Sequence, residues 1–205
     1  ISGGSTPIGL FTEILNQIDK KFKIKSNFFW VDERCVEPSS FDSNFGSANK
    51  HFFSKANISN NSIFRIKGEE KPEIEASNYT ELLKTKAETI KNIPSLDLCL
   101  LGIGGDGHTA SIFPHELKKL RDKSDCVIGT NPDSGQKRVS LSIKQINNSK
   151  EVIFHVCGSG KKDVVDMIIS KRDNYLDLPA SHILPKSKNL SWYLDFDSAE
   201  TFMGT

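Results

Sequence analysis

The stretch Leu101–Pro114 (LGIGGDGHTASIFP) directly follows an apolar, strand-like segment at Leu96–Leu101. Four glycines in it surround an Asp-Gly-His triplet that ends at His108. Glycine lets a backbone turn sharply and approach a ligand closely, at an entropic cost that a purely structural loop could avoid. In open α/β sheets, ligands bind at the carboxyl ends of the strands. We therefore predict that His108 is a reacting group held in a loop at the end of a buried strand.

Outward from this loop, strand-like and helical segments alternate along the chain. A near-continuous apolar run at 151–157 (EVIFHVC) is typical of a parallel strand covered on both faces. The alternation predicts an α/β fold with a Rossmann-like, mostly parallel sheet flanked by helices. Predicted strands are 27–31, 63–66, 96–101, 125–129, 138–143 and 151–157; predicted helices are 7–20, 47–54, 73–92 and a segment that opens at 158–161 and runs through 167–169; 32–46 is predicted to be a loop.

Composition limits the classes of function. The 205 residues suffice for one domain with a sizeable core, and we predict a single domain over 1–205. A net charge of +1 argues against a dedicated nucleic-acid binder. The sequence shows neither an apolar run of membrane-spanning length nor a signal peptide. These features predict a cytoplasmic enzyme or binding protein with neither nucleic-acid nor membrane partners.

The cysteines and histidines do not suggest a metal site. Cys35, Cys99, Cys126 and Cys157 are widely spaced in apolar settings without a CxxC pair, which predicts buried free thiols. No two histidines have the spacing of metal ligands. We assign no role to the four histidines outside the glycine loop, which are His51, His115, His155 and His182.

A glycine turn at Ser2–Pro7 (SGGSTP) precedes a predicted helix. Exposed amides and the positive end of the helix dipole favour phosphate there, and the hydroxyls of Ser5 and Thr6 add donors. The alternative is an ordinary hydroxyl cap of the helix, which would explain one hydroxyl but not the paired glycines. Since the sequence starts almost directly on this turn, we expect an N-terminal strand and helix to be missing or to belong to an upstream segment.

A second polar group, Asp32-Glu33-Arg34, follows the aromatic strand predicted at 27–31. A carboxylate and a guanidinium at a strand end can serve as an acid/base group and an anion clamp, because arginine can donate two hydrogen bonds to one phosphate. The alternative is a surface ion pair between neighbours, which taken alone is the commoner case.

The glycine loop offers a base for hydrolysis. Histidine titrates near neutrality, so His108 can take a proton from water. Asp106 could orient the imidazole or stabilise the turn, and we favour the turn role.

Together these motifs resemble those of the 6-phosphogluconolactonases, in order and spacing along nearly the whole chain. The resemblance implies hydrolysis of 6-phospho-D-glucono-1,5-lactone in the oxidative pentose phosphate pathway, on the fold shared by NagB, RpiA and CoA transferases. Some organisms fuse such a lactonase to glucose-6-phosphate dehydrogenase, so fusion to, or association with, that enzyme stays open for this chain. The motifs are SGGSTP at 2–7, DER at 32–34, GIGGDGHTASIFP at 102–114, SNFG at 43–46, KRVSLS at 137–142, GSGK at 158–161 and LPAS at 178–181.

On this interpretation His108 is the general base and Asp32 orients or supports His108 or the substrate hydroxyls. Backbone amides of the loop, with Asp106 in support, are candidate donors to the oxyanion. No cofactor is expected, and the partner is a small sugar phosphate lactone. The loop residues are Gly104, Gly105, Asp106 and Gly107; the predicted substrate and phosphate ligands are Gly3, Gly4, Ser5, Thr6, Arg34, Arg138 and Lys161.

Two alternatives stay open. A glucosamine-6-phosphate deaminase shares the strand-end Asp and the Asp-Gly-His loop, but its loop continues toward Asn-Glu-Pro, where the glutamate helps to open the sugar ring. This chain has Ser111–Pro114 (SIFP) there, without a carboxylate. A non-catalytic sugar-phosphate sensor would keep the anion site and lose the base, whereas His108 is present.

Overall fold

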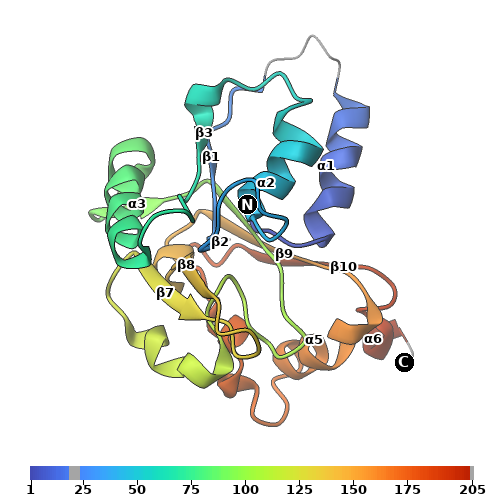
Figure 1. The fold of residues 1–205 in the computed structure, drawn as a ribbon. Helices are drawn as coiled ribbons and strands as arrows, with labels where there is room; N and C mark the ends of the chain where they lie inside the picture. The colour runs from blue at the N-terminus through green and yellow to red at the C-terminus, as the bar shows by residue number, and fades with distance from the viewer. Residues whose placement is uncertain (19–23, 204–205) are drawn as a thin grey trace.

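The structure is a computed structural model that describes residues 1–18 and 24–203 (Figure 1). Its central sheet is parallel, in the order β10–β9–β6, from strands β6 (Leu98–Leu101), β9 (Glu151–Val156) and β10 (Leu190–Leu194). Along β9 the side chains of Val152, Phe154 and Val156 are buried, while the alternate residues are less so. The apolar run at 151–157 therefore forms the predicted parallel strand.

A second parallel pair lies beside an aromatic cluster. β1 (Phe28–Phe29) pairs with β3 (Ile63–Phe64). Rings of Phe28, Phe52 and Phe53 pack against one another in this region. The aromatic strand predicted at 27–31 is thus present, but only two of its residues pair in the sheet.

The remaining strands are antiparallel, so the prediction of a mostly parallel sheet is not confirmed. β2 (Asp32–Arg34), β8 (Lys137–Leu141) and β7 (Cys126–Thr130) form an antiparallel sheet in the order β2–β8–β7. Residues 32–34, predicted as loop, are a strand because β8 supplies the partner for their backbone groups. The fold is α/β with a mixture of parallel and antiparallel pairing.

Helix α3 (Pro72–Lys86) is shorter than the predicted segment 73–92. After it, β4 (Glu88–Ile90) and β5 (Ile93–Ser95) form a hairpin. The two connecting residues, Lys91 and Asn92, have positive φ of 52° and 62°. Such a two-residue turn matches the twist of a hairpin and cannot continue a helix.

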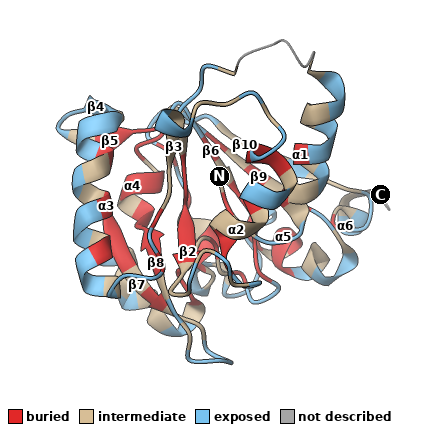
Figure 2. Ribbon diagram, turned by 45° about the horizontal axis from the view of Figure 1, so that its top comes forward, coloured by how far each residue is buried: buried red, intermediate tan, exposed pale blue. Residues whose placement is uncertain are grey.

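The other helices flank the sheets. α1 (Thr6–Gln17) packs on β9, and α3 covers β7 and β8 (Figure 1). Figure 2 shows buried residues along the strands and an exposed outer face on α3. The last predicted residues of the first helix, 19 and 20, lie outside the described residues. The remaining helices are α2 (Asn44–Ala48), which continues as a π-helix at Asn49–Phe53, α4 (Ile143–Ile146), α5 (Lys162–Ile169), α6 (Glu200–Met203), and the 3₁₀ segments Asn60–Ser62, Pro114–Arg121, Ser159–Lys161, Tyr175–Asp177 and Pro179–His182.

In the part of the chain that the structure describes, no helix combines the length and the apolar character needed to cross a membrane.

Candidate active site

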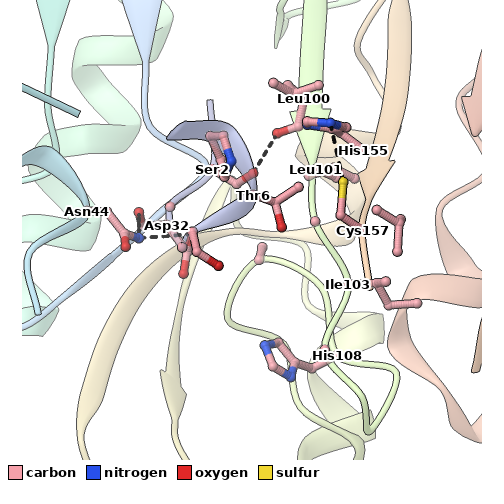
Figure 3. A pocket seen from close by; sticks show the side chains of 18 of the residues that line it. Ser2, Thr6, Asp32, Asn44, Leu100, Leu101, Ile103, His108, His155 and Cys157 are labelled. Atoms are coloured by element: carbon pink, nitrogen blue, oxygen red, sulfur yellow. Dashed lines mark hydrogen bonds between the residues drawn. The ribbon is translucent and has the colours of Figure 1, made fainter. Parts of the chain in front are cut away.

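One cavity is lined by segments that are far apart in the sequence (Figure 3). The turn at 2–7 borders it before α1, and residues 100–104 border it where β6 ends. Ligand sites of α/β proteins lie at such strand ends. Its wall also includes Asp32, Arg34, Asn44, His108, Ala110, Arg138, His155, Val156, Cys157 and Lys161.

Most of the predicted site residues line this cavity. They are Gly3, Gly4, Ser5, Thr6, Asp32, Arg34, Gly104, His108, Arg138 and Lys161. Gly105, Asp106 and Gly107 are not among its lining residues. These three residues therefore influence the cavity only by shaping the loop that carries His108.

His108 is oriented by Asp106. The ring Nδ1 lies 2.6 Å from Asp106 Oδ1, and the backbone N–H of His108 donates to the same oxygen at 3.1 Å. Burial alone would raise the pKa of Asp106, but the hydrogen bond and charge of His108 outweigh it and lower that pKa. An ionised Asp106 accepts a hydrogen bond from Nδ1–H, which leaves the Nε2 lone pair free to act as a base. Asp106 thus orients the imidazole as well as stabilising the turn, which differs from our preference for the turn role alone.

The hydrogen bonds of the Asp32 carboxylate go to residues other than His108. Its carboxylate accepts a hydrogen bond from Ser111 Oγ at 2.6 Å, and Asn44 Nδ2 lies 3.4 Å from its other oxygen. All three side chains are buried. Asp32 therefore joins strand β2 to Ser111 and to α2. Of its two predicted roles, supporting His108 and supporting the substrate hydroxyls, only the second fits these hydrogen bonds. Ser111 and Asn44 were missed as site residues, although both lie in the motifs quoted above.

Two of the four loop amides that were predicted to hold the oxyanion donate hydrogen bonds within the loop. The N–H of Gly104 donates to His108 O at 2.8 Å, and the N–H of Gly107 donates to Gly104 O at 2.9 Å. Gly107 also has φ of 81° and packs against Leu178, where a Cβ would lie 2.8 Å from its Cδ2. The structure therefore does not favour Gly104 and Gly107 as oxyanion donors; they shape the loop.

Two arginines face each other across β2 and β8. Arg34 and Arg138 are register partners in the antiparallel ladder. Burial and the nearby charge of Arg34 lower the pKa of Arg138. Within the described residues, the Nε atoms of both arginines are buried without a hydrogen-bond partner. Two like charges with unused donors favour the binding of an anion between them.

The residues Asp32-Glu33-Arg34 do not form the surface ion pair that was considered as an alternative. Glu33 is 2% exposed and accepts hydrogen bonds from the backbone N–H groups of Arg34, Asn44 and Phe45 and from Ser43 Oγ. Burial raises the pKa of Glu33 despite these donors. The Arg34 guanidinium instead donates to Asp42 O. Glu33 therefore holds the start of α2 in place and leaves Arg34 facing the cavity.

The turn before α1 keeps its hydroxyls free of a capping role. Ser5 is the N-cap residue, but its side chain makes no capping hydrogen bond. Ser2 Oγ donates to Leu100 O, which ties the turn to β6 (Figure 3). Gly3 lies directly against the buried Asn44 amide: a Cβ there would be 1.8 Å from Asn44 Oδ1. The hydroxyl cap considered as an alternative is absent, which favours the use of this turn for a ligand.

The prediction of buried thiols is wrong for Cys157. Cys99 and Cys126 are buried and Cys35 is half-buried, but Cys157 is exposed, at the cavity, with its Sγ 3.8 Å from His155 Nε2 (Figure 3). All four are free. β9 ends before Cys157, and Gly158 turns the chain with φ of 96°.

We expect one thiol of the native protein to react with Ellman's reagent and four to react after unfolding. Burial raises the pKa of Cys35 and Cys99 to about 11 and that of Cys126 to about 12. Burial and Asp195 also raise the pKa of Cys157, so its reaction should be slower than that of a free thiol. Cys157→Ser should abolish the native reaction; a remaining reactive thiol would contradict the low reactivity expected for the other three cysteines from their raised pKa values.

Among residues 1–18 and 24–203 there is no group of three or more His, Cys, Asp or Glu side chains placed to hold a metal ion.

Residues 1–192 match the family of glucosamine-6-phosphate isomerases/6-phosphogluconolactonase. The chain belongs to this family. The resemblance predicted from the motifs is therefore confirmed. The α/β architecture of the chain is shared with solved structures of this family.

Members of the family are similar to this chain over most of its length. A 6-phosphogluconolactonase of Treponema pallidum is 38% identical over 191 residues, covering 91% of this chain and 77% of that protein. The solved structure of 6-phosphogluconolactonase from Trypanosoma brucei has a TM-score of 0.86 and 28% identity, covering 98% of this chain and 84% of that chain. The human GDH/6PGL endoplasmic bifunctional protein is 31% identical, covering 97% of this chain and 25% of that protein.

Proposed function

We propose that the cavity hydrolyses 6-phospho-D-glucono-1,5-lactone to 6-phosphogluconate, with His108 as the base that activates water. Curated relatives of high coverage are 6-phosphogluconolactonases, so the chain is an enzyme of this activity. The observation that carries the mechanism is the Asp106–His108 pair, which presents one free imidazole nitrogen to a cavity that also contains two facing arginines.

The reaction needs one proton carrier. Water loses a proton to His108 Nε2 while its oxygen bonds to the lactone carbonyl carbon. The tetrahedral intermediate then collapses, and the bond from that carbon to the ring oxygen breaks. The imidazolium returns its proton to the departing ring oxygen, which becomes a hydroxyl. The new carboxylic acid ionises in water, so each turnover releases one proton.

The phosphate lies, in this proposal, among the turn at 2–7, Arg34, Arg138 and Lys161. Amides at the N-terminus of α1 suit a dianion, and the guanidiniums have unused donors. Of the loop glycines, Gly105 lies beside Lys161: a Cβ on it would be 3.9 Å from Nζ. With the phosphate there, the sugar ring extends toward His108 and Asp32. Asp32, fixed by Ser111, then accepts a hydrogen bond from a sugar hydroxyl.

The test is a continuous assay of proton release from freshly prepared 6-phosphogluconolactone, corrected for spontaneous hydrolysis. We expect clear acceleration with the native protein and no ammonia release from glucosamine 6-phosphate, because Ser111–Pro114 carries no carboxylate to open a sugar ring. Ammonia release without lactonase activity would identify a deaminase. Tight binding of 6-phosphogluconate without acceleration would identify a sensor.

Replacing Arg34 by alanine should mainly raise KM. The phosphate does not change during hydrolysis, so its contacts stabilise substrate and transition state alike and affect KM more than kcat. We expect KM to rise by about tenfold or more, as for the loss of a charge-assisted hydrogen bond. Arg65→Ala is the control, because Arg65 pairs with Glu69 outside the cavity. An unchanged KM in Arg34→Ala would remove Arg34 from the phosphate site.

The human relative also bears on which enzyme could supply the lactone. The human relative named above is a bifunctional GDH/6PGL protein. We infer for this chain that fusion to, or association with, glucose-6-phosphate dehydrogenase would deliver the short-lived lactone directly. A cytoplasmic location stays a prediction.

A further inference from the structure

Phe113 lies behind the cavity and contacts two groups of the site at once. Its ring centroid is 4.8 Å from that of His108, at an interplanar angle of 44°. The guanidinium carbon of Arg138 lies over the same ring, 5.5 Å from its centroid. Phe113 itself is 1% exposed and is not among the lining residues. It therefore touches the proposed base and a proposed phosphate ligand without reaching the substrate.

The local sequence fixes this ring. Phe113 precedes Pro114, and a residue before proline favours an extended backbone. Phe113 adopts it, with φ of −101° and ψ of 152°, as the N-cap residue of the 3₁₀ segment Pro114–Arg121. Its carbonyl accepts the N–H of Glu116. On the preceding side, the turn at Thr109–Ile112 closes through Ile112 N–H to Thr109 O. The ring has little freedom to move relative to the glycine loop.

We propose that Phe113 is a positioning residue that sets the placement of His108 relative to Arg138. The inference rests on the function proposed above, because it assigns His108 and Arg138 to the reaction. His108 comes from the loop after β6, and Arg138 comes from β8 in a different sheet. Phe113 is in contact with both, so it fixes the base relative to the anion clamp.

The chemistry of the ring suits this position. Aromatic faces carry partial negative charge and attract cations. Arg138 is a cation throughout, and His108 becomes one when it takes the proton from water. A leucine would fill much of the same space but would provide no such face. It would also let the imidazole and the guanidinium shift by the fraction of an ångström that matters for an aligned reaction.

Phe113→Leu should lower kcat by about 10- to 100-fold, the loss expected for a misplaced reacting group. It should also raise KM for the lactone by about 3- to 10-fold, the change that the loss of a cation–π contact corresponds to. The matched control is Phe52→Leu, since Phe52 is 2% exposed and packs against Phe11 and Phe28 rather than the site. The control should lose similar thermal stability and keep the kinetic constants of the native protein. Phe113→Met serves as a second ring-free variant if Phe113→Leu does not fold.

Double variants separate positioning from general destabilisation. In a His108→Asn background, Phe113→Leu should reduce kcat by no more than about twofold, because the group that it positions is gone. In an Arg138→Met background, the effect of Phe113→Leu on KM should likewise disappear. Losses that multiply in both backgrounds, or kinetic constants equal to those of Phe52→Leu, would overturn the inference.

One binding measurement keeps the two proposals apart. Calorimetry should show that Phe113→Leu binds 6-phosphogluconate more weakly than the native protein does. The double variant Phe113→Leu/Arg138→Met should bind it as tightly as Arg138→Met does. A native protein without lactonase activity would refute the proposed function, while this binding cycle would still decide whether Phe113 positions Arg138. An active native protein with an unaltered Phe113→Leu variant would refute only the positioning role.

Discussion

His108→Asn should lower kcat for the lactone by about 10²- to 10⁴-fold, the range that a positioned general base contributes. Asparagine keeps an atom that can accept a hydrogen bond but cannot take a proton from water at neutral pH. KM should change little, because the groups proposed to hold the phosphate are untouched. Steady-state kinetics on fresh lactone, with the spontaneous rate subtracted, measure both constants.

The matched control for this variant is Asp106→Asn. It removes the carboxylate that is 2.6 Å from His108 Nδ1 while leaving the imidazole in place. It should lower kcat by less than His108→Asn does, because the base remains but loses its fixed tautomer and orientation. Near-normal kcat in His108→Asn would exclude His108 as the base. A larger loss in Asp106→Asn than in His108→Asn would assign the base role to the carboxylate.

Gly104→Ala should lower kcat almost as much as His108→Asn does, through steric displacement alone. A Cβ on Gly104 would lie 2.1 Å from His108 Nδ1 and 2.5 Å from Asp106 Oδ1. Both atoms belong to side chains, so the protein can fold by displacing the imidazole and separating it from Asp106. Because a displacement of about 1 Å can cost 10²-fold in rate, we expect kcat to fall by about that factor.

Gly102→Ala is the comparison within the same loop, since a Cβ at Gly102 meets no atom within 4 Å. It should lose far less activity than Gly104→Ala, although both replace a glycine of one motif. Thermal unfolding of the two variants shows whether each folds. If Gly104→Ala keeps native kcat with an intact fold, the imidazole works from another position than the one described.

The glycine loop was predictable from sequence because its information is local. Glycines, Asp106 and His108 lie within a few residues, and the apolar strand before them shows where the loop begins. The carboxylate partner of His108 was harder to assign: Asp106 and Asp32 are equally plausible by type, and only the fold shows that Asp106 reaches Nδ1.

Pairing between distant segments was not predictable. Asp32–Arg34 is a strand only because Lys137–Leu141, about a hundred residues later, provides its ladder partner. β10 (Leu190–Leu194) was not predicted, although its LSWYL sequence pairs in parallel with β9. Asn44 and Ser111 were not recognised as neighbours of Asp32 for the same reason: their contacts span sequence separations of 12 and 79.

The buried carboxylate of Asp32 bears on how the product leaves. Hydrolysis keeps the phosphate but turns the uncharged lactone group into a hydroxy acid, whose carboxylate would form near His108 in the proposed placement. In the proposed placement, the arginines hold substrate and product through the same phosphate. Only the product would bring a carboxylate close to Asp32, which is 5% exposed and poorly screened by water. If the proposed placement holds, we expect 6-phosphogluconate to bind less tightly than the lactone, so that hydrolysis itself favours release of the product.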